Sequence, residues 1–125
     1  MSYTYDPTNV FARILRGEIP SSFIYESTHA VAFRDIRPQA PNHVLVIPRG
    51  PYVNFDHFAD VASSEEIIDF TRAVAAVSRQ LGVTPDDGAG YRLIANSGDH
   101  ARQEVPHLHI HILAGCPLGP MLTKV

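Results

Sequence analysis

Imidazole and aliphatic side chains alternate along His107-Leu108-His109-Ile110-His111-Ile112-Leu113. Successive side chains of a β-strand point to opposite faces of the sheet, so a strand over residues 107–113 places all three imidazoles on one face. The aliphatic side chains then lie on the other face. We therefore expect the aliphatic face to close a hydrophobic core and the histidine face to line a site.

Three interpretations of the histidine face are open. Three imidazoles in register are an unusual pattern for a plain solvent-facing surface. A zinc site accepts three histidines, but a strand commonly supplies two ligands, and Cys116 is the one cysteine of the chain. Clustered imidazoles also bind anions, act as nucleophiles and move protons near neutral pH. We favour anion chemistry and expect no metal.

The hydrophobic pattern on both sides of this strand predicts a mixed fold. Helices are expected over residues 9–16 and 63–81, and strands over 23–25, 30–34, 43–47, 91–95 and 107–113. Ser63 and Glu66 form a capping box that marks the start of the longer helix. The order α-β-β-β-α-β-β predicts an α+β fold in which helices pack on an antiparallel sheet.

Composition narrows the classes of protein that fit. The chain has 125 residues, 45% of them hydrophobic and 18% charged, which is typical of one globular domain. A net charge of −3 is unlike a nucleic-acid coat, so we expect no nucleic-acid partner. One cysteine excludes an internal disulfide, and no segment is apolar for the ~20 residues of a membrane span. We expect a cytoplasmic protein without membrane contact.

The alternating run resembles the motif of the histidine triad (HIT) family, in which three histidines are separated by hydrophobic residues. Three further blocks resemble the family at the same separations: Phe33–Pro48, Gly90–Asn96 followed by Gln103, and Pro117–Leu122. The last block is similar to the tail of bacterial members of the nucleotide-binding (Hint) branch. The resemblance implies a single HIT domain over residues 1–125 and a homodimer in which the five-stranded sheet continues across both copies.

The resemblance also implies an activity. Members of this branch are purine nucleoside phosphoramidases, which cleave the P–N bond of adenosine or other purine 5′-monophosphoramidates to a nucleoside monophosphate and an amine. The reaction passes through a nucleotidyl-histidine intermediate and needs no cofactor. The partner is then a purine nucleotide of the AMP or GMP type. Two alternatives remain: a dinucleoside polyphosphate hydrolase, and a nucleotide-binding regulator with weak catalysis.

Four histidines receive catalytic roles from the resemblance. His109 is the nucleophile that attacks phosphorus. His111 contacts the phosphate and protonates the leaving group. His107 and His43 form a hydrogen-bonded support behind the nucleophile. Such a nucleophile needs its second ring nitrogen held as a donor, commonly by a backbone carbonyl near the first histidine of the triad.

Five further residues are expected to bind the nucleotide. Asp35 accepts hydrogen bonds from the ribose hydroxyls, because a carboxylate offers acceptors alone. Phe33 and Ile36 form apolar walls for the purine. Asn96 and Gln103 donate amide N–H groups to the phosphate, which His109 and His111 also contact.

Four positions depart from the family pattern. Ala101 and Arg102 stand where relatives often have two glycines, so a positive φ there would be strained. Glu104 stands where many eukaryotic members have a phosphate-binding serine, and an ionised carboxylate cannot donate a hydrogen bond. Pro106 replaces a residue that is commonly aromatic, and it suits the start of a strand because it has no N–H.

Overall fold

A computed structural model describes residues 2–123, so both ends of the single domain expected over residues 1–125 lie outside the described residues. The elements in chain order are α1 (Val10–Leu15), β1 (Phe23–Glu26), β2 (Ala30–Arg34), β3 (Asn42–Pro48), α2 (Phe55–Val61), α3 (Ser64–Gln80), β4 (Tyr91–Ile94), the 3₁₀ turn η1 (Asp99–Ala101) and β5 (Ile110–Ala114). This order confirms the α+β class.

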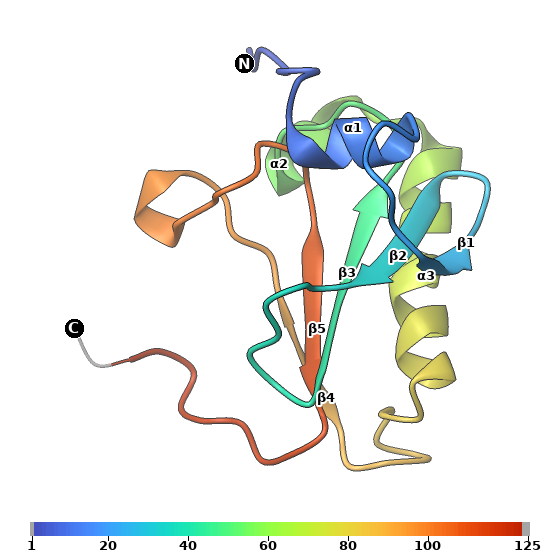
Figure 1. Cartoon of the computed structure of the whole chain (residues 1–125), viewed down its shortest axis with the longest axis vertical. Helices are drawn as coiled ribbons and strands as arrows, with labels where there is room; N and C mark the ends of the chain where they lie inside the picture. Colours follow the sequence, from blue (N-terminus) through green and yellow to red (C-terminus); the bar gives the residue numbers. More distant parts are fainter. Residues whose placement is uncertain (1, 124–125) are drawn as a thin grey trace.

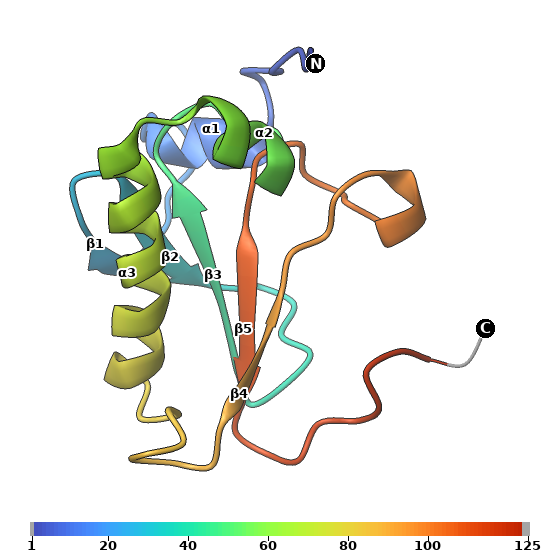
Figure 2. The same ribbon diagram turned by 180° about the vertical axis from the view of Figure 1, so that it is seen from behind.

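The strands form one antiparallel sheet in the order β1-β2-β3-β5-β4. The long helix α3 runs along one face of this sheet, and α1 crosses the other face near one end (Figures 1 and 2). β3, which carries His43, is the central strand, and β5, which carries His111, is its neighbour. Side chains from distant parts of the chain meet there.

Strand alternation divides the core into two parts. Ala32 of β2 and Val46 of β3 face α3, where they pack with Phe70 and other buried residues. Their neighbours Phe33 and Leu45 face α1 and pack against its helix. His43 is two residues before Leu45 on β3, so it shares the α1 face. This face carries the side chains that are expected to form the site.

Local hydrogen bonds explain the long helix. The Ser63 hydroxyl accepts from the Glu66 N–H at 3.1 Å, and the Glu66 carboxylate accepts from the Ser63 N–H at 3.1 Å. The predicted capping box is confirmed, with Ser63 as N-cap and the helix itself starting at Ser64.

The expected number of helices was wrong. A further helix, α2, fills the connection between β3 and α3. The Asn54 side chain begins it by accepting from the His57 N–H at 2.9 Å. At 7 residues, α2 is too short to show a clear helical period in the sequence, and its buried Phe58 carries its contact with the core.

The expected strand over residues 107–113 begins later than predicted, at Ile110. Val46 pairs with Ile110, so the next hydrogen-bonded positions would set Pro48 opposite Leu108. Proline has no N–H to give to the ladder, and the Leu108 N–H instead donates to the Tyr52 carbonyl at 2.8 Å. Pro106 lies in a bend before this segment and does not start the strand.

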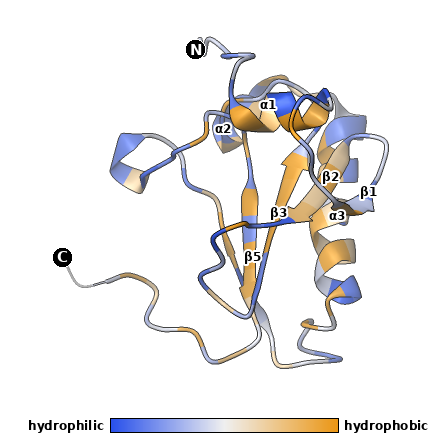
Figure 3. Ribbon diagram, viewed as in Figure 1, coloured by the Kyte–Doolittle hydropathy of each residue, from blue (hydrophilic) through white to orange (hydrophobic). Residues whose placement is uncertain are grey.

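The period-two alternation nevertheless persists through residues 107–109. Leu108 and Ile112 belong to the core under α3, whereas the rings of His107 and His109 contact Phe11 of α1. The central strands are hydrophobic, and the loop between β2 and β3 and the η1 segment are hydrophilic (Figure 3). Within residues 2–123, no helix has both the length and the apolar character that crossing a bilayer requires.

Candidate active site

A hollow of about 720 Å³ lies on the α1 face of the sheet. Its walls come from α1, from the end of β2 with the loop that follows, from the segment around η1, and from the histidine strand. Eight of the lining residues are Phe11, Phe33, Asp35, Ile36, Asn96, Glu104, His109 and His111. The sheet thus brings the expected nucleotide-binding and catalytic segments to one place.

His109 presents a free lone pair. Its Nδ1 lies 2.7 Å from the His107 carbonyl oxygen, which can only accept, so Nδ1 carries the proton and Nε2 is unprotonated in the neutral ring. The side chain is 8% exposed, and burial lowers its pKa below the usual 6.5, against the opposing effects of that carbonyl, Asp35 and Glu104. A neutral imidazole oriented in this way is suited to nucleophilic attack.

His107 supports this geometry without lining the hollow. The ring is fully buried, and its Nε2 lies 2.8 Å from the Pro48 carbonyl oxygen. Its Nδ1 lies 2.7 Å from the Tyr5 hydroxyl. Burial is the main reason that the pKa of His107 falls to about 4, so the ring is neutral at physiological pH. The expected support behind His109 comes from the backbone carbonyl of His107.

His43 is bonded to His111 and not to the expected nucleophile. The Gln39 N–H donates to His43 Nδ1 at 3.0 Å, which leaves the proton of His43 on Nε2. That Nε2–H donates to His111 Nδ1 at 2.8 Å. The proton of neutral His111 is therefore on its Nε2. The expectation that His43 supports His109 was wrong, because His43 is bonded to His111.

His111 is therefore a neutral hydrogen-bond donor. Burial, with His109 and His43 as neighbours, lowers its pKa to about 4. At pH 7 the ring carries little imidazolium from which to protonate a leaving group. It lines the same hollow as His109, so it offers an N–H where His109 offers a lone pair.

Asp35 lies at the edge of the histidine pair. One carboxylate oxygen accepts from the Arg37 N–H at 2.8 Å, and the other lies 3.5 Å from His43 Nε2. Asp35, His43 and His111 place one potential ligand atom each within 4.8 Å of one another, the one such group found in residues 2–123. A metal ion bound by these three residues would displace the His43–His111 hydrogen bond.

The remaining expected binding residues separate into two groups. Phe33, Ile36 and Asn96 line the hollow; Phe33 is buried against Phe11, and Ile36 is 92% exposed. The structure places Gln103 elsewhere.

The Gln103 amide NH₂ donates to the Val53 and Val105 carbonyls, at 2.7 and 3.1 Å, and its oxygen accepts from the Gly98 N–H at 3.1 Å. With both amide hydrogens engaged, Gln103 ties down the loop and does not supply the expected phosphate donor.

The sequence interpretation missed two contributors. Phe11 of α1 packs edge-on against His109, with ring centroids 5.0 Å apart, and forms part of the wall. Tyr5 contacts His107 from a segment that shows no periodicity. The helical spacing of α1 indicated that Phe11 is buried, but not which face of the sheet it covers.

A positive φ angle occurs in the loop in which Ala101 and Arg102 replace the glycines of relatives. Arg102 has φ 59° and ψ 44°, and it is the one non-glycine residue with positive φ among residues 2–123. Ala101 lies in the ordinary turn η1 and is not strained.

Comparison with known proteins adds to this geometry. The family model of the HIT domain matches residues 16–118. The chain belongs to the HIT family. A HIT-like protein of Azospirillum brasilense is 56% identical over 99% of both chains. The purine nucleoside phosphoramidase of Escherichia coli K12 is 47% identical over 91% of this chain and 92% of its own.

The HIT fold is confirmed by solved structures. A HIT family hydrolase from Clostridium thermocellum has a TM-score of 0.78 at 38% identity and covers 93% of this chain and 97% of its own. A HIT family hydrolase from Legionella pneumophila has a TM-score of 0.77 at 34% identity and covers 90% of this chain and 96% of its own.

Proposed function

We propose that this chain is a nucleotide-binding hydrolase that cleaves the P–N bond of purine nucleoside 5′-monophosphoramidates. The observation that carries the proposal is the bond from His109 Nδ1–H to the His107 carbonyl, which leaves Nε2 as a nucleophile in the hollow. The name of the Escherichia coli relative supports the same reaction.

The reaction has two displacements at one phosphorus atom. His109 Nε2 forms a bond to phosphorus while the P–N bond to the amine breaks, and the leaving nitrogen takes up a proton from solvent, so the amine leaves neutral. Water then forms a P–O bond while the P–Nε2 bond breaks, the proton of that water returns to solvent, and the nucleoside monophosphate leaves. His111 Nε2–H and the Asn96 amide stabilise charge on the phosphate oxygens by hydrogen bonding.

Nucleotide recognition follows from the neighbouring side chains. Asp35 accepts hydrogen bonds from the ribose hydroxyls with a carboxylate that the Arg37 N–H holds in place. Phe33 and Ile36 both line the hollow and form apolar walls for the purine. Polar and apolar side chains both line the hollow, which suits a ligand that carries a charged phosphate as well as a purine ring.

The proposal is tested by turnover of an adenosine 5′-monophosphoramidate by protein that has been treated with EDTA and desalted. We expect full activity without metal, because an imidazole nucleophile needs no metal-activated water. His109→Ala should lose several orders of magnitude in turnover, whereas it should bind AMP almost normally.

Two outcomes would contradict the proposal. One is a loss of activity in EDTA that stoichiometric Zn²⁺ restores, which would favour a metal at Asp35, His43 and His111. The other is a higher kcat/KM for diadenosine polyphosphates than for the phosphoramidate, which would favour the alternative hydrolase. His57→Ala is the matched control, because that histidine lies on α2 outside the hollow.

We also propose that two copies associate through β4. This strand ends the sheet and pairs on one side with β5. Tyr91 and Leu93 of β4 are exposed, and with Phe55 they border an apolar hollow of about 490 Å³ between α2, α3 and β4. An exposed apolar edge strand next to an apolar hollow is a surface that a second copy can cover.

A further inference from the structure

Both ring nitrogens and the carbonyl oxygen of His107 take part in hydrogen bonds. Its Nε2–H donates to the Pro48 carbonyl at 2.8 Å, so its Nδ1 must be an acceptor. The Tyr5 hydroxyl lies 2.7 Å from that Nδ1 and is therefore the donor. The carbonyl of the same residue receives the Nδ1–H of His109 at 2.7 Å. His107 thus connects Tyr5 to the proposed nucleophile.

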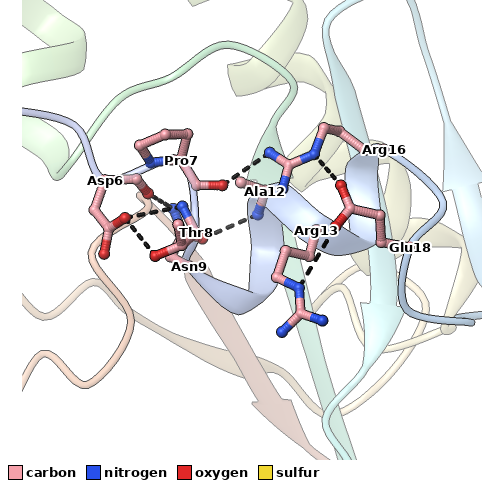
Figure 4. A network of polar contacts seen from close by, with 8 residues as sticks. All are labelled: Asp6, Pro7, Thr8, Asn9, Ala12, Arg13, Arg16 and Glu18. Carbon is pink, nitrogen blue, oxygen red and sulfur yellow. Dashed lines mark hydrogen bonds and ion pairs between the residues drawn. The ribbon is translucent and has the colours of Figure 1, made fainter.

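The segment after Tyr5 is held in place by its own polar contacts (Figure 4). Asp6 accepts from the Thr8 N–H at 2.8 Å and from the Thr8 hydroxyl at 2.6 Å. The Asn9 side chain donates to the Asp6 carbonyl at 2.7 Å and accepts from the Ala12 N–H at 2.9 Å, which caps α1. The chain therefore leaves Tyr5 in a fixed direction and enters a helix that forms one wall of the hollow.

Burial makes the Tyr5 contact consequential. The His107 ring is 0% exposed, so water does not replace a lost partner easily. A buried ring nitrogen without a partner is costly, and the ring can relieve that cost by rotating or by moving its proton. Either change breaks the bond from Nε2–H to the Pro48 carbonyl and so loosens His107, whose carbonyl orients His109.

We propose that Tyr5 is a positioning residue for the HIT-family reaction: its hydroxyl locks His107 and thereby holds His109 in its attacking orientation. The inference rests on the proposed function for its kinetic part. The match to the family model begins at residue 16, so this contact comes from a part of the chain outside that match.

The test compares Tyr5→Phe with Tyr3→Phe. Both variants remove one phenol hydroxyl from the same segment, but Tyr3 donates to the Asp56 carboxylate on α2 and is exposed. We expect Tyr5→Phe to lower kcat about tenfold with KM within about twofold, since misorientation acts on the chemical step. Tyr3→Phe should leave both constants within about twofold.

A second readout does not depend on turnover. The ¹⁵N shifts of the imidazoles in the intact chain report which ring nitrogen carries each proton. In the wild-type chain we expect the proton of His107 on Nε2 and that of His109 on Nδ1. In Tyr5→Phe we expect the His109 signals to shift or broaden, and in Tyr3→Phe to stay unchanged.

Several results would overturn the proposal: a Tyr5→Phe kcat within twofold of wild type, an equal loss in Tyr3→Phe, or a wild-type spectrum with the His107 proton on Nδ1. Wild-type protein without phosphoramidase turnover would refute the proposed function alone. The imidazole spectra then decide the positioning role, because unchanged His109 signals in Tyr5→Phe would refute it.

Discussion

His109 and His111 are two residues apart, line one hollow and carry opposite tautomers. A backbone carbonyl holds the proton of His109 on Nδ1, and His43 holds that of His111 on Nε2. One ring therefore presents a lone pair and the other an N–H. The alternating sequence indicated that both rings share a face, but the tautomers depend on Gln39 and on the His107 carbonyl, which the spacing does not reveal.

In the proposed mechanism, the pKa of His109 sets the acid limb of the rate profile, because the neutral ring is the attacking form. Burial lowers this pKa below the usual 6.5, so the midpoint of the acid limb should lie below pH 6.5. Glu104 is one of the groups that raise this pKa, so Glu104→Gln should move the limb to still lower pH. The measurement is kcat/KM against pH.

The exposed Glu65 at the start of α3 provides the control, and Glu65→Gln should leave the limb in place. A midpoint at or above pH 6.5 in the wild-type protein would show that another group controls the rate.

Elements differed in how far their sequence determined them. The helix α3 was predictable because its cap and its hydrophobic period are local. The start of β5 was not, because it depends on Pro48 in another strand, and the role of Gln103 depends on carbonyls of Val53 and Val105. Contacts between residues far apart in the sequence decide where β5 starts and what Gln103 binds. The alternation of histidine and aliphatic residues, in contrast, predicted which face each histidine occupies.

The segment around η1 carries a testable strain. Arg102 adopts the left-handed conformation, which costs a residue with a Cβ of order 1 kcal/mol relative to glycine. We therefore expect Arg102→Gly to raise the free energy of unfolding by about 1 kcal/mol. Urea denaturation measures the change.

Arg102→Ala removes the same guanidinium but keeps the Cβ, so it should leave the stability close to that of wild type. Equal stabilities of the glycine and alanine variants would show that the loop stores no strain at this position.

At the scale of the whole molecule, the two faces of the sheet have separate tasks. The face under α3 holds the main core, and the face under α1 holds the hollow, with β4 at one edge. The class of fold and the face of the site were predictable from local patterns. The apolar hollow beside β4 was not, because it joins α2, an unpredicted helix, to distant residues of α3 and β4.

The proposed association through β4 predicts a change of mass in solution. Leu93→Glu places a charge on the exposed edge strand, and we expect it to convert a dimer to a monomer in sedimentation experiments. Ile68→Glu is the control, because Ile68 is an exposed aliphatic residue of α3 that does not line the apolar hollow. A wild-type monomer, or dimers in both variants, would refute the association.

The alternation of histidine and aliphatic residues has a consequence for folding itself. If β5 slipped by one residue against β3, His111 would turn toward the core under α3, and Ile110 and Ile112 would leave it. Such a misaligned state loses apolar burial and also buries a polar ring without its hydrogen-bond partner. Both effects raise its free energy. The alternating pattern that contains the proposed catalytic residues thus also favours one register of the central strands during folding.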